Sequence, residues 1–410
     1  MTKRVKLEFI EPLRKKGAPI IIVAAVREAE AIANACKENG IKISAFCDTE
    51  KRKTLEKFCD LDVIHTPNIP NKYPDARFII ASHHIIDVEN QLTEMGYNEF
   101  YSALKLFENY NVENYEYRIS KSYMKSRIDS YKKTHSAYFN DTKLYMRSVD
   151  IMVTTKCSMK CESCSNLMQY YKNPQDSDYI KTIESLEILR SHVDDISEYR
   201  IIGGEPLMNR NWSNIVNVII EKNPKRKVYI YTNGTISPKE DQIKNFTGKD
   251  VNFVITDYGK LSRNVDRLTE LLNKNEITYV RTPAENWLEC GTIKQHNRSV
   301  QDQKEVFKQC CVKYVYTLLD GKLYRCPFIA NANNLKAMPD NPSNYVDLFS
   351  KTDPVQNQLK RLMNVAKFFP GCDFCVGRPY DPTSNIGYDG KGMITPAKQS
   401  KKILKYKLYK

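Results

Sequence analysis

Residues 157–164 are Cys157-Ser158-Met159-Lys160-Cys161-Glu162-Ser163-Cys164, and they follow the strand-like run Val-Asp-Ile-Met-Val-Thr-Thr at 149–155. Three thiolates on one short loop can bind one face of a metal centre, and no further Cys or His stands nearby in the sequence to complete the set. An iron–sulfur cube normally takes four protein ligands. The loop therefore predicts a cube with one iron left open for another ligand.

The composition indicates an intracellular protein of several domains. With 410 residues the chain has room for two or three domains. The apolar run 18–26 leads into a charged, helix-like stretch without a cleavage site, so we expect a buried strand there and not a signal peptide. No run reaches the ~18 apolar residues that a membrane span requires. We expect a cytoplasmic location. Cysteines in tight clusters in such a protein are more often metal ligands than partners in disulfides.

The formal net charge of +14 is spread along the chain and partly concentrated in the basic tail, 381–410. A diffuse excess of this kind usually means a solvated surface, although contact of the tail with a membrane surface stays open. As a partner it favours a small anionic molecule such as a phosphosugar or a sugar nucleotide. Nucleic acid is not expected.

Residues 1–110 alternate strand and helix signals, which predicts a Rossmann-like domain with a parallel sheet. The first turn, 24–29, contains no glycine, so the close approach of backbone to a dinucleotide pyrophosphate is not predicted. A short helix is expected at 54–59, and the pair His83-His84 is expected on a surface loop. The cysteines of this domain are interpreted as small buried hydrophobes, and they are Cys36, Cys47 and Cys59.

The rest of the chain divides by pattern. Residues 111–146 are charged and tyrosine-rich and predict a helical connector. Residues 147–305 repeat strand and helix signals, which predicts a partial (β/α)6 barrel with its chemistry at the carboxyl ends of the strands. The cysteine loop occupies the first of these ends.

Two further strand ends carry groups suited to ligand binding. The strand at 199–202 runs into Gly203-Gly204-Glu205-Pro206, and the strand at 227–232 ends at Asn233-Gly234. Glycines let the backbone approach a ligand, while exposed carbonyls and Glu205 can accept bonds from an ammonium group. Asn233 is the next polar candidate, and Thr256 and Asp257 follow at the next strand end.

Cys-x3-Cys-x2-Cys at a first strand end, followed by Gly-Gly-Glu-Pro and Thr-Asn-Gly, resembles the radical S-adenosylmethionine (SAM) superfamily. The resemblance implies a [4Fe–4S] cluster on Cys157, Cys161 and Cys164, with SAM chelated to the open iron and cleaved by one electron to a 5′-deoxyadenosyl radical. It also implies an external one-electron donor such as flavodoxin or ferredoxin. The residues it places around SAM are Gly203, Gly204, Glu205 and Asn233.

One position departs from the pattern of that superfamily. The residue before the third cysteine is usually aromatic and packs near the adenine, whereas here it is Ser163. Adenine must then be held elsewhere, and Met168, Tyr170 and Tyr171 are the candidates just downstream.

A second set of cysteines follows, consisting of Cys290, Cys310, Cys311, Cys326, Cys372 and Cys375. Asp320-Gly321 predicts the tip of a β-hairpin between 315–319 and 322–325. A thiolate before the hairpin, one after it and the Cys372-x2-Cys375 pair supply four ligands. Either Cys310 or Cys311 fits the first position, and a structural zinc site remains the alternative to iron. Cys290 is interpreted as a buried thiol or a group near the substrate.

Residues 306–380 resemble the twitch domain, a truncated SPASM domain of radical SAM enzymes, which implies one auxiliary [4Fe–4S] cluster. The whole chain resembles members found in surface-glycan biosynthesis. This implies an enzyme, of the oxidoreductase type if the substrate is dehydrogenated, that oxidises or epimerises a sugar or nucleotide-linked sugar. One alternative is a SPASM-like maturase of a ribosomally made peptide, and another is a non-enzymatic iron–sulfur electron-transfer protein.

Overall fold

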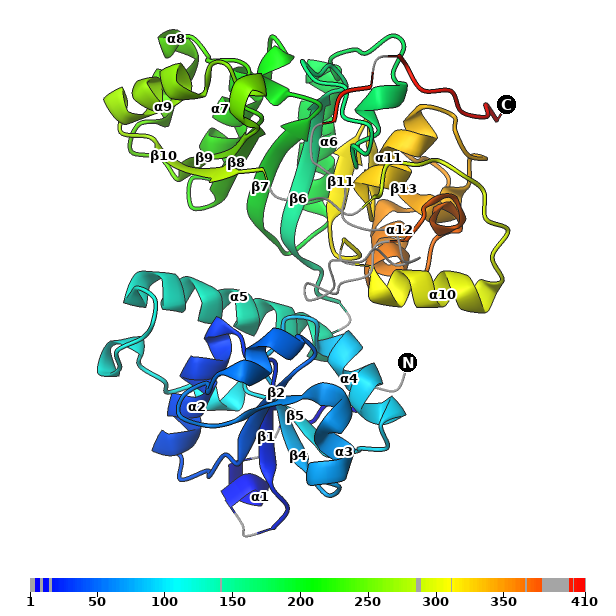
Figure 1. Ribbon diagram of the computed structural model, residues 1–410. Coiled ribbons are helices and arrows are strands. Elements are labelled where there is room, and N and C mark those ends of the chain that lie inside the picture. The colour runs from blue at the N-terminus through cyan, green and yellow to red at the C-terminus, as the bar shows by residue number, and fades with distance from the viewer. Residues whose placement is uncertain are drawn as a thin grey trace. The chain divides into compact units, whose positions relative to one another are not determined.

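The chain folds into two compact units, the first covering Met1–Tyr145 and the second beginning at Met146 (Figure 1). The computed structural model describes residues 4–7, 10–14, 17–140, 142–284, 289–310, 312–365, 367–377, 398–400 and 402–409. Among the described helices, none is both long and apolar enough to cross a membrane.

The first unit is built on a five-stranded sheet in the order β3-β2-β1-β4-β5, with parallel pairing throughout. This is the doubly wound arrangement in which strand order reverses beside β1. Its strands are β1 (Ile20–Val23), β2 (Ala45–Asp48), β3 (Val63–His65), β4 (Arg77–Ile80) and β5 (Phe100–Ser102). Its helices are α1 (Ile10–Arg14), α2 (Arg27–Glu38), α3 (Ile69–Lys72), α4 (Ile85–Glu94) and α5 (Lys121–Phe139).

Both faces of this sheet are buried, which explains why β1 is apolar at every position. Ile20 and Ile22 join a core with residues of α2 and α5, while Ile21 and Val23 join a second core with residues of α4. Parallel strands covered on both faces are typically continuous apolar runs. Cys36 and Cys47 are buried in these two cores, as expected.

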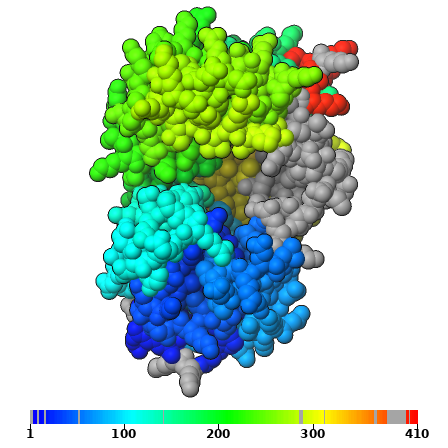
Figure 2. Space-filling model, turned by 60° about the vertical axis from the view of Figure 1, so that its left-hand side comes forward, coloured from blue at the N-terminus to red at the C-terminus, as the bar shows by residue number. Residues whose placement is uncertain are grey.

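The helical segment expected as a connector packs on the first unit. Met124, Ile128 and Tyr131 of α5 are buried in the same core as Ala29 and Ile32 of α2. Figure 2 shows the cyan residues of this segment lying against the blue residues of the amino-terminal part. The three apolar residues recur at helical spacing, so one face of α5 is covered by this unit.

One local expectation in this unit is wrong, and a second holds only in part. In place of the helix at 54–59, a 3-10 helix spans Lys51–Leu55 and is followed by a turn in which Phe58 pairs with Leu61. His83 does lie on a loop, but it is partly buried because its ring is bonded to the buried carboxylate of Glu28. His84, the next residue in the sequence, lies at the surface, and its amide donates to the Ser82 hydroxyl.

The second unit contains an eight-stranded sheet in the order β10-β9-β8-β7-β6-β11-β12-β13. Its strands are β6 (Tyr145–Thr154), β7 (Asp195–Gly203), β8 (Lys227–Thr232), β9 (Val251–Asp257), β10 (Thr278–Pro283), β11 (Tyr316–Leu319), β12 (Lys322–Tyr324) and β13 (Tyr345–Asp347). Its helices are α6 (Tyr179–Ser191), α7 (Trp212–Lys222), α8 (Glu240–Ile243), α9 (Val265–Lys274), α10 (Val300–Gln309), α11 (Pro327–Asn334) and α12 (Val355–Lys360).

Within 147–305 the described residues form five of the six strands that the expected (β/α)6 barrel requires. Strands β6 to β10 follow one another in chain order, but the next strand, β11, pairs in parallel with β6 at the opposite edge and not with β10. Burial explains the choice, since every residue of β11 is buried whereas β10 is largely exposed. The apolar strand β11 thus pairs with β6 and is buried there, and β10 remains an exposed edge strand.

The hairpin predicted around Asp320-Gly321 is confirmed, with β11 and β12 pairing Leu319 with Lys322. Asp320 and Gly321 both have positive φ, 49° and 78°. A two-residue turn of this kind needs left-handed backbone at both positions, which Asp and Gly tolerate. The hairpin extends the sheet of the second unit and leads directly to Cys326.

Candidate functional site

The cysteine loop after β6 is held against the end of β7 by backbone hydrogen bonds. The Gly204 amide donates to the Thr154 carbonyl at 3.0 Å, and the Glu205 amide donates to the Lys156 carbonyl at 2.8 Å. A Cβ atom on Gly204 would lie 2.3 Å from the Lys156 carbonyl oxygen and 2.7 Å from Cys157 Cβ. Glycine is required here because no side chain fits between the two segments.

Glu205 is completely buried, and its carboxylate is used inside the protein. Thr232 Oγ1 and the Leu207 amide donate to Oε1 at 2.9 and 3.2 Å, and the Asn233 amide donates to Oε2 at 2.8 Å. Burial raises the pKa of Glu205 to about 7, although these bonds lower it. The Glu205 carboxylate is therefore engaged within the protein, whereas the Gly204 carbonyl accepts no bond from the described residues.

Asn233 connects the end of β8 to the cysteine loop. Its Nδ2 lies 3.7 Å from Cys157 Sγ and 3.2 Å from Ser158 Oγ, and its Oδ1 accepts from the Thr235 amide and hydroxyl. The structure therefore brings together the residues predicted from three separate strand ends. They are Cys157, Cys161, Cys164, Gly203, Gly204, Glu205 and Asn233.

The three thiols form a compact group with Met159 and Tyr258. Burial raises the pKa of Cys157 to about 12 and that of Cys161 to about 11, and the neighbouring thiols contribute to both increases. Metal ligands must be deprotonated, so a positively charged centre is needed to make these buried thiols into thiolates. Three thiols grouped in this way fit the ligands of an iron–sulfur cluster better than three cysteines that serve only to pack the core.

Sequence reasoning missed the tail residues beside this loop. The Lys160 amide donates to Gln399 Oε1 at 2.6 Å, and Gln399 Nε2 lies 3.4 Å from Cys161 Sγ. Backbone bonds link the Glu162 amide to the Lys398 carbonyl and the Ser400 amide to the Lys160 carbonyl. Nothing in the sequence indicates this contact, because Gln399 is far along the chain and follows no recognisable pattern.

The expected adenine partners lie mainly in the core. Tyr171 is buried, and its hydroxyl bonds Asn331 and Asn334 at 2.8 and 2.9 Å. Tyr170 is buried against the ring of Tyr406. Tyr258, which sequence reasoning missed, packs directly against the cysteine group and is only partly buried. It is the better aromatic candidate.

Asp257 is committed to another interaction. Its Oδ2 accepts two bonds from the Arg281 guanidinium at 2.9 and 2.7 Å, and its Oδ1 accepts from the Gly259 amide. The adjacent Thr256 lies on the partly buried face of β9. Asp257 could contact a ligand only if this ion pair opened.

The second cysteine set is also brought together. Burial raises the pKa of Cys372, and the thiols of Cys326, Cys375 and Cys310 raise it further because they lie close by. Cys311, the other candidate for the first position, lies outside the described residues. The four described thiols come from the end of α10, the start of α11 and the Cys372–Cys375 turn.

The Cys372–Cys375 turn is fixed by the segment before α10. The Arg298 guanidinium donates to the Cys372 and Cys375 carbonyls at 3.0 and 2.8 Å. The Arg298 amide donates to the Asp373 carboxylate at 2.7 Å. Cys290 lies apart from this set, with its Sγ 3.7 Å from the Ser163 carbonyl of the first loop.

Within the described residues, no three His, Cys, Asp or Glu side chains are placed to hold a single metal ion. Ligands of one zinc ion surround it at ~2.3 Å. Ligands of an iron–sulfur cube bind separate irons and so need a wider arrangement.

A polar face of the sheet continues from this site. Ile201, Ile230 and Phe253 are fully buried on one face, while Arg200 and Tyr231 alternate with them on the other. Arg200 lies 3.3 Å from Glu198 and 3.8 Å from Asp150. Burial raises the pKa of Asp150 to about 7, although Arg200 lowers it.

Comparison with known proteins covers the first site. Residues 147–263 match the model of the 4Fe–4S single cluster domain, which includes the first three cysteines and none of the second set. GTP 3′,8-cyclase of Clostridium acetobutylicum is 30% identical over 139 residues, which are 33% of this chain and 42% of that protein. The chain thus spans less than half of the curated relative. The matched segment contains the three-cysteine loop and the Gly-Gly-Glu-Pro turn, so this part of the chain is similar to a single-cluster 4Fe–4S domain.

Solved structures with some likeness include BtrN in complex with AdoMet and 2-DOIA, with 16% identity and a TM-score of 0.37, covering 57% of this chain and 94% of that one. Streptococcus suis SuiB bound to the precursor peptide SuiA has 13% identity and a TM-score of 0.29, covering 67% and 80%. These scores are too low to carry the fold or the substrate over to this chain.

Proposed function

We propose that this chain, a radical SAM protein by its central domain, cleaves SAM to form a 5′-deoxyadenosyl radical that oxidises or epimerises a sugar or nucleotide-linked sugar. The observation that carries the proposal is the junction of three strand ends. Cys157, Gly204 and Asn233 come from the ends of β6, β7 and β8, and the structure places them in direct contact.

The residues of this junction have distinct roles. Cys157, Cys161 and Cys164 would hold the [4Fe–4S] cluster, which when reduced supplies the electron that breaks the S–C5′ bond of SAM. The Gly204 carbonyl would accept a bond from the SAM ammonium. Glu205 holds the end of β8 in place through Thr232 and the Asn233 amide. Tyr258 would pack against the adenine.

The sugar substrate is supported by the polar face of the sheet. Arg200, Asp150, Glu198 and Tyr231 offer charged and hydroxyl groups on this face, as a polyhydroxylated or phosphorylated molecule requires. The net charge of +14 favours an anionic substrate. The relative with 30% identity is named for a reaction of GTP, itself a nucleotide.

The second cysteine set would hold an auxiliary [4Fe–4S] cluster through Cys310 or Cys311 together with Cys326, Cys372 and Cys375. Such a cluster can accept the electron that a substrate radical loses on oxidation. Arg298 places a positive charge against the Cys372 and Cys375 carbonyls, which favours a centre with anionic thiolate ligands. Flavodoxin or ferredoxin would supply electrons from outside.

The SAM assignment is tested by replacing Cys157, Cys161 and Cys164 together with Ala. After anaerobic reconstitution and reduction with dithionite, the variant should form no 5′-deoxyadenosine, while Cys59→Ala in the first unit should match the unaltered protein. Retained formation of 5′-deoxyadenosine by the triple variant would refute the assignment.

The substrate class is tested separately by deuterium transfer. Nucleotide sugars and phosphosugars deuterated on carbon should deliver deuterium to 5′-deoxyadenosine if one of them is the substrate. Transfer from a deuterated peptide in place of every sugar would refute the sugar proposal and favour peptide maturation, while leaving SAM cleavage intact.

A further inference from the structure

The first unit contains a pocket of about 460 Å³ that the SAM chemistry does not use. It is formed by the loop after β1, the loop after β2 and the residues entering and beginning α5. Its volume lies within the ~300–1,000 Å³ typical of small-molecule sites. Phe58 and Tyr123 supply aromatic rings to its wall.

The charges lining this pocket are strongly unbalanced. Glu56 is the one acidic residue of the lining, against five cationic side chains, and these are Arg27, Lys53, Lys57, Arg118 and Arg127. Lys53 is paired with Asp48 and Glu50, and Arg127 is paired with Glu28. Arg27, Lys57 and Arg118 form no ion pair within the described residues. Three cations that line one pocket and form no ion pair repel one another unless an anion binds between them.

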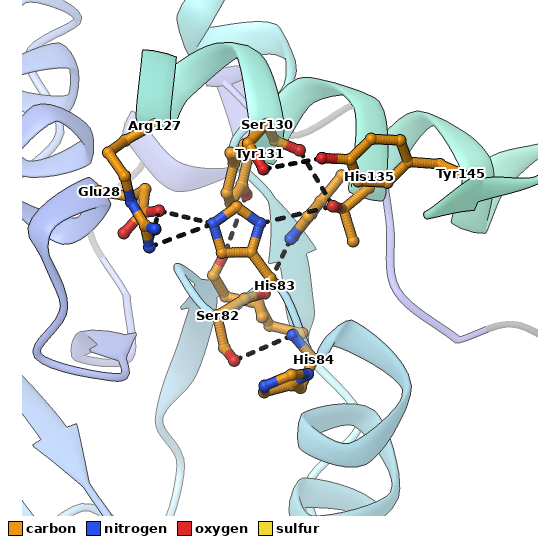
Figure 3. Close-up of polar contacts among 11 residues, drawn as sticks. Glu28, Ser82, His83, His84, Arg127, Ser130, Tyr131, His135 and Tyr145 are labelled. Carbon is orange, nitrogen blue, oxygen red and sulfur yellow. Dashed lines mark hydrogen bonds and ion pairs between the residues drawn. The ribbon is translucent and has the colours of Figure 1, made fainter. Parts of the chain in front are cut away.

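Near this pocket lies the point beside β1 where the strand order of the sheet reverses. A side chain of the protein already occupies this point. Glu28, in the first turn of α2, is fully buried, and its Oε1 lies 2.5 Å from both His83 Nε2 and Arg127 (Figure 3). Burial raises the pKa of Glu28, but bonding to His83 and the charges of His83 and Arg127 outweigh it, so the net shift is downward. A carboxylate therefore stands where a pyrophosphate would meet the helix in a dinucleotide-binding fold.

The acidic residue at the end of β2 is also engaged. Asp48 accepts bonds from the Ala25 amide, the Glu50 amide and Lys53 Nζ, each at 2.9 Å. In dinucleotide-binding folds a carboxylate in this region binds the ribose. Both anchors of a dinucleotide are thus taken, while the unpaired cations lie beside them and face the pocket.

We propose that this pocket binds a small molecule carrying a diphosphate or phosphate ester, held by the side chains of Arg27, Lys57 and Arg118 and not by a glycine-rich turn. Arg118 lies with its guanidinium 5.0 Å from the Phe58 ring centre, so it is oriented by a cation–π contact while its charge faces the pocket. The aromatic wall can pack against a base or a sugar ring. This site is independent of SAM cleavage.

The test is calorimetric titration of the full chain with inorganic pyrophosphate, ADP, UDP and a UDP-sugar. We expect at least one to bind with a dissociation constant below about 1 mM, with affinity falling as salt rises. Arg27→Gln and Arg118→Gln should each weaken binding about tenfold, because each removes one charged hydrogen-bond donor. Lys42→Gln, an exposed lysine before the opposite end of β2, is the matched control and should bind like the unaltered chain.

The outcomes separate the ligand sources and the two proposals. Equal affinity for pyrophosphate and UDP would show that the pocket recognises the phosphates alone. Tighter binding of UDP or the UDP-sugar would show that the aromatic wall also contacts the ligand. No binding of any of the four, or binding that both arginine variants leave unchanged, would overturn the site. The same titration on the Cys157, Cys161 and Cys164→Ala variant should give unchanged affinity, so failure of SAM cleavage does not affect the result.

Discussion

Gly204→Ala is the substitution that most directly tests the junction between the cysteine loop and β7. The added Cβ would lie 2.3 Å from the Lys156 carbonyl oxygen, where ordinary contacts begin near 3.4 Å. One of the two backbone segments must therefore move by about 1 Å, a displacement that in an active site can cost ~100-fold in rate. Overpacking of this kind costs about 1–3 kcal/mol of stability.

The assay measures iron content, 5′-deoxyadenosine formation and thermal unfolding of Gly204→Ala after anaerobic reconstitution. Gly248→Ala is the control, because its added Cβ meets nothing within 4 Å while its φ of +69° costs about 1–2 kcal/mol in strain. Both variants should lose some stability, but Gly204→Ala alone should lose most of its SAM cleavage. Activity of Gly204→Ala within twofold of the unaltered chain would refute the reasoning from close backbone contact.

Two further predictions concern protons and metals. His135 is buried, accepts a bond from the Ser102 hydroxyl at 2.8 Å and donates to the Ser82 carbonyl at 3.0 Å, and burial lowers its pKa from 6.5 to about 3. Between those pH values the unfolded chain binds a proton that the folded chain does not, so the free energy of unfolding should fall as pH falls, by up to about 1.4 kcal/mol per pH unit from this group. Chemical denaturation at pH 6 and pH 4 should show a smaller fall for His135→Gln than for the unaltered chain. Equal falls would contradict the assignment. For the two cysteine sets, reconstituted protein should contain about eight irons per chain if both hold cubes; about four irons and one zinc would instead support the structural zinc site.

Local features of the sequence predicted local geometry well. The spacing of Cys157, Cys161 and Cys164 and the Asp320-Gly321 turn are properties of adjacent residues, and both are found as expected. The alternation in 1–110 likewise predicted a parallel sheet, because each strand and helix carries its own apolar pattern. The exception was His83, whose partial burial accompanies its bond to Glu28 from another element.

The sequence by itself determined that a three-cysteine loop, a Gly-Gly-Glu-Pro turn and a further cysteine set belong to one protein. Only the tertiary structure decided that β11 pairs with β6, that Gln399 reaches Cys161 and that Glu205 is turned inward. It also decided that three cations with no ion pair in the described part of the chain line a pocket in the first unit. The physical reason is that spacing and periodicity are encoded by neighbouring residues. Contacts between distant segments depend instead on which apolar faces are buried together and which charges are left without a partner.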